Sequence, residues 1–235
     1  MQLDGFDGRV ALITGGARGI GRQIAETLRD QGAAVAVGDL QAPDIPDVLG
    51  LALDVTDEAS VQRAVAEVSD RLGTPDILVL NAGIFVVEPL ESTSLDSWRR
   101  SVDVNLTGAF LCAREVLPLM RAAGYGRVLA IGSSAGITGG SKSMAAYGAS
   151  KAGVMALAKS IASEYAPHGI TSNALAPSLI ETDMLADIAD LASRVPVGRL
   201  GQPRDVADLV AFLCSEQAGY ITGAVVDING GFLIH

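Results

Sequence analysis

The sequence is poor in aromatic residues and in positive charge. Aromatic residues make up only 4% of the 235 residues, although 49% are hydrophobic, so Val, Leu, Ile and Ala must form the core. A chain this apolar is not expected to be disordered. Lys and Arg number 17 against 27 Asp and Glu, which gives a formal net charge of −10. No basic cluster offsets this charge, so we expect no binding to the phosphate backbone of DNA or RNA.

Cysteine and long apolar runs are also scarce. Cys112 and Cys214 lie far apart in apolar surroundings, which is typical of buried thiols and predicts neither a disulfide nor a metal site. The N-terminus is acidic where a signal peptide would be basic, and no apolar run approaches the roughly 18 residues that span a bilayer. We therefore expect a cytoplasmic protein without a membrane partner.

Short β-rich apolar runs alternate with longer segments of helical period along the chain. This order predicts an α/β fold, a doubly wound parallel sheet of about seven strands with helices on both faces. The expected strands lie near 9–14, 33–39, 50–53, 76–80, 126–133, 169–175 and 223–228. The expected helices lie at 19–31, 57–73, twice within 94–122, at 146–166 and at 203–215. Two prolines within 40–49 predict a loop or a single turn there. Because no linker or repeat interrupts this order, residues 1–235 are expected to form one domain.

A glycine-rich turn follows the first expected strand and leads directly into a helix. Gly15 can adopt the positive φ of a sharp turn, Gly19 allows a ligand to approach the backbone, and Gly21 allows close packing of helix on sheet. The helix N-terminus presents unpaired N–H groups to a pyrophosphate. The turn, including Arg18 and Ile20, therefore predicts a Rossmann-type dinucleotide site, although its G-x-x-x-G-x-G spacing differs from the commonest fingerprint.

Asp39, at the end of the second expected strand, indicates which dinucleotide is bound. Its carboxylate can accept both hydroxyls of an adenosine ribose and would repel a 2′-phosphate. The sequence thus favours NAD, with NADP the less favoured cofactor. Arg18 leaves an alternative open, because it can pair either with a 2′-phosphate or with the pyrophosphate.

The motif Tyr147-Gly148-Ala149-Ser150-Lys151, together with the glycine-rich turn, resembles the short-chain dehydrogenase/reductase family over essentially the whole chain. Further matching pieces are Asp54-Val55, Asn81-Ala82-Gly83, Asn105, Ser134, which lies thirteen residues before Tyr147, and the segment 173–182. The resemblance implies a single NAD(P)-binding catalytic domain and a homotetramer. The small residues of 146–166 suit helix pairing across two-fold axes.

The spacing of Tyr147 and Lys151 also makes chemical sense without the resemblance. Residues four apart share one face of a helix, and a nearby ammonium favours the phenolate. The pair can therefore supply a general base for alcohol oxidation or a general acid for ketone reduction. The resemblance implies that Ser134 orients the substrate oxygen, that Lys151 also holds the nicotinamide ribose, and that Asn105 holds a proton-relay water.

The resemblance assigns the remaining cofactor contacts. Asp54 and Val55 are expected beside the adenine, although Asp54 is equally suited to cap the next helix. The contacts beyond the adenine are expected from Asn81, Ala82, Gly83, Pro177, Ile180 and Thr182. Ser178 stands where the family usually has glycine, which restricts the backbone there. A short lid with Met184, Leu185, Ile188 and Leu191 on its apolar face predicts a compact, partly open substrate pocket.

The predicted function is hydride transfer between a nicotinamide cofactor, preferably NAD, and a secondary alcohol or ketone. The alternatives are an NADPH-dependent reductase similar to 3-oxoacyl-[acyl-carrier-protein] reductases, a non-catalytic NAD sensor, and an isomerase or lyase. Serine hydrolysis at the G-x-S-x-G motif around Ser134 is rejected, because a glycine-rich loop follows it and only two histidines exist. A phosphate loop at 136–143 is rejected, because Ser141 replaces its second glycine.

Overall fold

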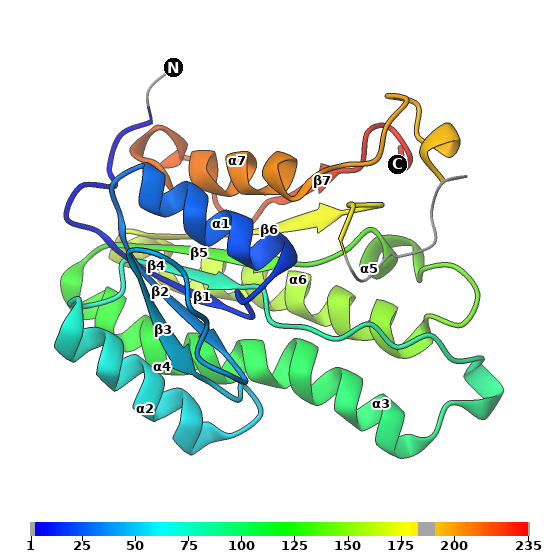
Figure 1. Cartoon of the computed structure of the whole chain (residues 1–235), viewed down its shortest axis with the longest axis horizontal. Helices are drawn as coiled ribbons and strands as arrows, with labels where there is room; N and C mark the ends of the chain where they lie inside the picture. The colour runs from blue at the N-terminus through cyan, green and yellow to red at the C-terminus, as the bar shows by residue number, and fades with distance from the viewer. Residues whose placement is uncertain (1–2, 183–190, 235) are drawn as a thin grey trace.

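Seven parallel strands form one sheet at the centre of the molecule (Figure 1). This computed structural model describes residues 3–182 and 191–234. The strand order is β3-β2-β1-β4-β5-β6-β7. The strands are β1 (Val10–Thr14), β2 (Ala34–Asp39), β3 (Val48–Ala52), β4 (Ile77–Leu80), β5 (Gly126–Ile131), β6 (Ile170–Pro177) and β7 (Val225–Ile228). From β1 the sheet extends to one side through β2 and β3, and the chain then returns to the other side of β1 to add β4 to β7. Such a switch in strand order opens a crevice at the carboxyl ends of the strands. The predicted doubly wound fold is confirmed.

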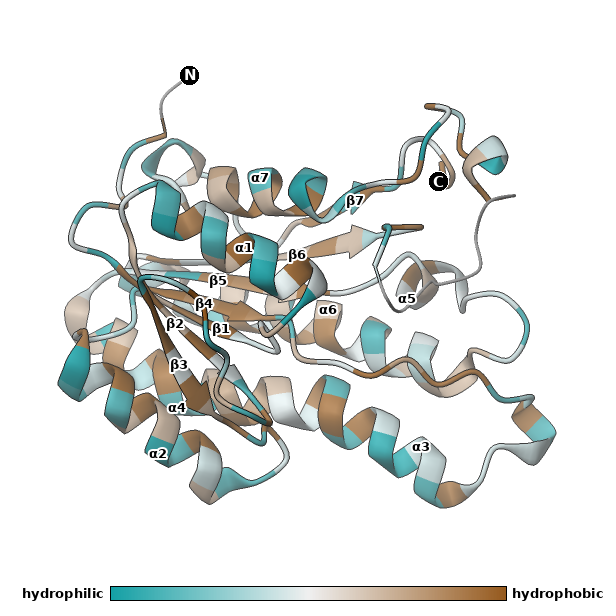
Figure 2. Ribbon diagram, in the orientation of Figure 1, coloured by the Kyte–Doolittle hydropathy of each residue, from teal (hydrophilic) through white to brown (hydrophobic). Residues whose placement is uncertain are grey.

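Helices cover both faces of the sheet, as Figure 1 shows. One apolar layer lies under α1 and α7, and the other lies under α2, α4 and α6. The helices are α1 (Gly19–Asp30), α2 (Glu58–Arg71), α3 (Leu95–Val102), α4 (Gly108–Ala123), α5 (Ala135–Thr138), α6 (Ala145–Tyr165) and α7 (Pro203–Cys214). Figure 2 shows brown strands at the centre and teal residues on the surrounding helices α1, α2 and α7. All five residues of β1 are buried, as expected for a strand covered on both faces.

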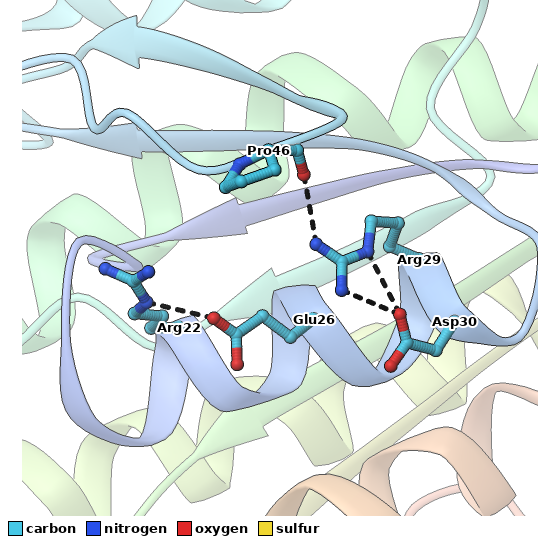
Figure 3. Close-up of polar contacts among 5 residues, drawn as sticks. All are labelled: Arg22, Glu26, Arg29, Asp30 and Pro46. Atoms are coloured by element: carbon cyan, nitrogen blue, oxygen red, sulfur yellow. Dashed lines mark hydrogen bonds and ion pairs between the residues drawn. The ribbon is translucent and has the colours of Figure 1, made fainter.

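The connection between β2 and β3 has no helix, as its prolines predict, and β3 begins two residues earlier than expected. Figure 3 shows how this loop is fastened to α1: Arg29 donates from Nη1 to the carbonyl of Pro46 at 3.0 Å and also bonds Asp30. Ile45 is 3% exposed within the core on the α1 side. The loop is therefore packed against the edge of the sheet and can form a wall for anything bound beside β2.

The two helical stretches expected within 94–122 are joined by a short π-helical segment. The segment, η2, spans Asp103–Thr107 and lies directly between α3 and α4. A π-turn inserts an extra residue into a helix and often occurs at functional sites. Here it places Asn105 on the side that faces α6, where Nδ2 of Asn105 lies 2.9 Å from Oγ of Ser150.

Shorter elements complete the described chain. These are the 3₁₀ turns η1 (Leu90–Ser92), η3 (Ala166–His168), η5 (Ala192–Arg194) and η6 (Glu216–Ala218). Cys112 and Cys214 are free and buried, as predicted, and burial raises the pKa of the Cys112 thiol to about 12. Within residues 3–182 and 191–234, no helix is both long and apolar enough to cross a membrane.

Candidate active site

A cavity of about 1510 Å³ lies at the carboxyl ends of the strands. The turn after β1, the ends of β2, β4, β5 and β6, and the N-terminal part of α6 all contribute to its wall. Every predicted site residue except Asn105 lines this cavity. The expected lid falls largely on residues 183–190, which lie outside the described residues; of its apolar face, Leu191 is described and lines the cavity.

The glycine-rich turn packs so closely against the end of β4 that two of its positions have no room for a side chain. Gly15 has φ +68°, and a Cβ on it would lie 2.6 Å from the Cα of Ala82. A Cβ on Gly21 would collide with the side-chain amide of Asn81. That amide donates to the carbonyl oxygens of Gly15 at 2.6 Å and of Thr14 at 3.1 Å, which braces the turn against β4. Because Gly19, Ile20 and Gly21 line the cavity, the N-terminus of α1 is accessible to a ligand, as a pyrophosphate site requires.

Asp39 points toward the same turn from the end of β2. Its Oδ2 accepts a hydrogen bond from the backbone N–H of Ala17 at 3.0 Å, and its Oδ1 accepts one from the N–H of Leu40 at 2.8 Å. Two backbone donors therefore hold the carboxylate at the cavity wall. An orientation fixed in this way suits a carboxylate that accepts hydrogen bonds from a ribose.

Asp54 and Val55 line the cavity next to β3. Asp54 accepts hydrogen bonds from the N–H and the hydroxyl of Thr56 at 2.9 and 2.7 Å. The N-cap of α2 is Asp57, which accepts from the N–H of Ala59 at 3.0 Å. The alternative in which Asp54 caps this helix is therefore wrong, and its carboxylate orders the turn before the cap.

Tyr147 and Lys151 face the cavity from the first turns of α6. The Nζ atom of Lys151 lies 6.0 Å from the centroid of the Tyr147 ring and donates to the carbonyl of Ile131 at 2.7 Å. The ring of Phe85 meets that of Tyr147 edge to face, with centroids 4.9 Å apart. Tyr147 is thus held between an aromatic ring on one side and its own helix on the other.

Burial acts on both of these groups in the direction that disfavours charge. It raises the pKa of Tyr147, and a hydrogen bond with Ser133 opposes this by a smaller amount. It lowers the pKa of Lys151 from 10.5 to about 8. The sequence argument expected the lysine to lower the pKa of the phenol. In the structure desolvation dominates instead, because both groups are withdrawn from water.

The serine that contacts the phenol is Ser133, and not Ser134, to which the thirteen-residue spacing points. The Oγ atom of Ser133 also accepts from the N–H of Ala135 at 3.1 Å. Ser134 lies one residue further, where its N–H donates to the carbonyl of Pro177 at 3.0 Å and its own carbonyl accepts from Thr138. Both serines line the cavity, but only Ser133 has this contact with the tyrosine.

Asn105 is 1% exposed and lies behind the cavity wall. Its Oδ1 accepts from the N–H of Ile84 at 2.7 Å, and its Nδ2 donates to the carbonyl of Ile84 at 3.0 Å and to Oγ of Ser150 at 2.9 Å. The amide therefore connects the loop after β4 to α6. It keeps Ile84 and the helix that carries Tyr147 at a fixed separation.

The chain after β6 forms the far wall of the cavity. The predicted contacts Pro177, Ile180 and Thr182 line it, and Ser178 lines it as well. The expected restriction at Ser178 does not arise, because the left-handed conformation falls on Leu179 at φ +52°. Ser178 instead donates its N–H to the carbonyl of Ile228 at 3.1 Å, which ties the turn to β7.

The argument against serine hydrolysis predicted the wrong element after Ser134. Ser134 is followed directly by the short helix α5, where a glycine-rich loop was expected. Within residues 3–182 and 191–234, no histidine lines the cavity, because His168 lies in η3 beyond the far end of α6.

Comparison with known proteins identifies relatives over nearly the whole chain. The family described as Enoyl-(Acyl carrier protein) reductase matches residues 15–233. The chain is 42% identical to the 3-oxoacyl-[acyl-carrier-protein] reductase FabG of Salmonella typhimurium, covering 96% of this chain and 98% of that protein. It is 38% identical to the 2-dehydro-3-deoxy-L-rhamnonate dehydrogenase (NAD(+)) of a Sphingomonas strain, covering 96% of each.

A solved structure shows how closely the fold is shared. A putative gluconate dehydrogenase from Agrobacterium tumefaciens superposes with a TM-score of 0.90 at 31% identity, over 97% of this chain and 96% of that one. The glycine-rich turn, the tyrosine and lysine on α6 and the matches over nearly the full length therefore point to the same family. The chain belongs to the short-chain dehydrogenase/reductase family and is an oxidoreductase that acts on CH–OH or carbonyl groups.

Proposed function

We propose that the protein is an NAD-dependent dehydrogenase that oxidises a secondary alcohol, with a hydroxy acid as the preferred substrate class. The observation that carries the proposal is Asp39, whose carboxylate is held at the cavity wall by the N–H groups of Ala17 and Leu40. A 2′-phosphate would meet this fixed negative charge, whereas ribose hydroxyls can donate to it.

The residues present fit a dinucleotide. Gly15, Gly19 and Gly21 line the cavity at the N-terminus of α1. We assign the pyrophosphate to this turn with Gly19, Ile20 and Arg18. We assign the adenosine to Asp39, Asp54 and Val55, and the nicotinamide half to Asn81, Ala82, Gly83, Tyr147, Lys151, Pro177, Ile180 and Thr182. A bound nicotinamide supplies the hydride chemistry, and the protein supplies position and proton transfer.

Tyr147 is the proposed general acid and base. Its phenolate oxygen accepts the hydroxyl proton of an alcohol, and its phenol returns a proton to a carbonyl oxygen. Ser133 donates a hydrogen bond to the same substrate oxygen, since its hydroxyl already lies beside the phenol. A cationic Lys151 next to the site favours the phenolate once ligands are bound, and Asn105 fixes the loop and helix on which these groups stand.

A second candidate function is supported by the 42% identity with the FabG protein. In that case the enzyme would reduce a 3-oxoacyl group with NADPH. The same tyrosine and serine would serve that reaction, so the choice between the two functions rests on the cofactor and on the substrate.

The test compares rates with NAD and NADP over a panel of secondary alcohols and hydroxy acids, followed by nicotinamide absorbance. We expect NAD to be preferred and Tyr147→Phe to lose at least about 100-fold in kcat. Ser133→Ala is expected to lose at least about tenfold in kcat, while Ser134→Ala, its matched neighbour, stays within about threefold.

Each other result has a defined meaning. Bound NADH without repeated turnover of any alcohol or ketone would identify a sensor. A preference for NADPH with 3-oxoacyl thioesters would favour the reductase. A loss in Ser134→Ala that is larger than in Ser133→Ala would restore Ser134 as the substrate-orienting residue.

A further inference from the structure

Besides Arg194, the positively charged side chains that line the cavity are Arg18, Arg99, Arg100 and Lys151. Arg18 lies in the glycine-rich turn, and Arg99 and Arg100 lie on α3. The α3 helix packs on α6, and the guanidinium of Arg99 lies 3.9 Å from the carboxylate of Asp96 on the same helix. Lys151 is buried beside Tyr147. Arg194 belongs to none of these places, since it lines the cavity from η5, beyond the turn that follows β6.

Arg194 is paired with an aromatic ring from the C-terminal segment. Its guanidinium carbon lies 5.7 Å from the centroid of the Phe232 ring, and both side chains line the cavity. Such stacking engages the face of the guanidinium and leaves its N–H edges available. Among the ion pairs formed within residues 3–182 and 191–234, none includes Arg194.

The backbone around this pair is held in place on both sides. Val195 is 5% exposed and packs over Gly230, where a Cβ would lie 2.7 Å from Cγ1 of Val195. The N–H of Val197 donates to the carbonyl of Gly230 at 3.1 Å. Asn229 fixes the next turn, since its Oδ1 accepts from Gly231 at 2.9 Å. Arg194 and Phe232 are therefore presented by two segments that support each other.

The surroundings of the reactive tyrosine give this cation a role. Phe85, Met144 and Leu179 add apolar side chains to the wall, which suit the carbon skeleton of a substrate. The whole chain carries a net charge of −10, and such a field disfavours the approach of an anion unless a local cation offsets it. An arginine with free N–H edges binds a carboxylate through two parallel hydrogen bonds.

We propose that Arg194, supported by Phe232, is the residue that binds the substrate carboxylate and thereby selects hydroxy acids over neutral alcohols. The inference rests on the proposed function and names the group that sets its substrate class. Arg194 takes no part in proton or hydride transfer. It fixes the charged end of the substrate while Tyr147 and Ser133 engage the carbinol oxygen at the other.

The test uses substrates that differ only in charge. 3-Hydroxybutanoate, 4-hydroxypentanoate and 4-hydroxycyclohexanecarboxylate are each compared with their methyl esters, with NAD in excess. The variants are Arg194→Gln, which removes the charge, and Arg194→Lys, which keeps it without the planar fork. Arg204→Gln on α7 is the matched control, because it removes an exposed arginine that pairs with Asp208 away from the cavity.

In the wild type we expect at least one acid to exceed its ester at least about tenfold in kcat/KM. Arg194→Gln should lower kcat/KM for that acid about 10- to 100-fold, mainly through KM, and leave the ester within about twofold. Arg194→Lys should retain part of the preference, and Arg204→Gln all of it.

Two results would overturn the assignment while the proposed function stands: esters or neutral alcohols oxidised as well as the acids by the wild type, or a preference for acids that survives in Arg194→Gln. A wild type that binds NADH but oxidises neither acids nor neutral alcohols would instead contradict the proposed function, and the assignment with it.

Discussion

At the scale of single residues, the cofactor preference depends on one carboxylate. Asp39 accepts hydrogen bonds from two backbone N–H groups, so its position does not depend on a flexible side-chain partner. Any group bound at the end of β2 meets a negative charge that cannot turn away without the loss of both bonds. A ribose hydroxyl that donates to this carboxylate would bind specifically, because one hydrogen bond to a charged group contributes about 1.5–3 kcal/mol.

We predict that Asp39→Ala shifts the ratio of kcat/KM for NAD to that for NADP about 10- to 100-fold toward NADP. The change removes both the acceptor for the ribose and the repulsion of a 2′-phosphate. Asp44→Ala is the matched control, because Asp44 is an exposed carboxylate in the neighbouring loop. Equal ratios in Asp39→Ala and the wild type would show that this carboxylate does not discriminate between the two dinucleotides.

Lys151 is the second residue with a measurable signature, because the fold withdraws its ammonium from water. Its pKa in the folded protein is about 8, below the ordinary value of 10.5. Between these two pH values the unfolded chain binds more protons than the folded chain. The contribution of Lys151 to folding stability therefore rises as the pH rises through 8.

We predict that the free energy of unfolding of the wild type, minus that of Lys151→Met, increases by about 1 kcal/mol from pH 7 to pH 9. Urea unfolding of the protein without dinucleotide measures this difference. Lys159→Met is the control, because Lys159 is exposed on the same helix and its difference should stay constant. A constant difference for Lys151→Met as well would mean that the amine is not desolvated.

The two serines show that the spacing of a motif and the packing of the fold can point to different residues. Counting back thirteen residues from Tyr147 crosses the irregular loop between α5 and α6, and the length of such a loop does not fix a position in space. Counting forward from the end of β5 does, because strand register is set by the sheet. Ser133 is the second residue after Ile131, and this signal was available in the sequence.

At the scale of elements, hydrophobic pattern predicted most of the fold. The strand β1 is a short, continuous buried run and α1 carries one buried stripe, so the existence and order of such elements follow from run length and period. The π-turn η2 could not be predicted in this way. It depends on the side chain of Asn105 meeting Ile84 and Ser150, which are 21 and 45 residues away in the chain.

The segment after β6 illustrates the same limit. The comparison with the family motif located the strain at Ser178, but the positive φ lies on Leu179. The hydrogen bond from Ser178 to Ile228 of β7 decides this, and so distant a partner has no local sequence signal. Motifs thus indicated which segments form the cavity, and tertiary contacts decided which atom within each segment faces it.

At the scale of the whole molecule, several apolar side chains on the outer helices are exposed to solvent. Trp98 on α3 is 37% exposed and Phe110 on α4 is 44% exposed. Ala149 and Ala156 are exposed small residues on α6, while Gly153 is already used within the chain against Leu106. Large apolar patches on a monomer often mark an interface, so we retain the homotetramer as a proposal.

We predict that sedimentation velocity at micromolar concentration gives a mass near four times 24.1 kDa. Ala156→Glu should reduce the assembly to dimers, because it would place a charge opposite itself across a two-fold axis. Lys159→Glu is a control for the change in charge on the same helix. A stable monomer in the wild type would refute the proposal.

The residues at the two ends of the cavity are held in place by different parts of the fold, and this difference affects how such a protein can evolve. The groups proposed for proton transfer stand on buried backbone and on the amide of Asn105. Arg194 and Phe232 belong instead to a peripheral turn and to the end of the chain, which support mainly each other. Mutations there can change which compound is accepted at little cost to folding or to the reaction chemistry. New specificities can therefore arise in small steps, each of which leaves a working catalyst.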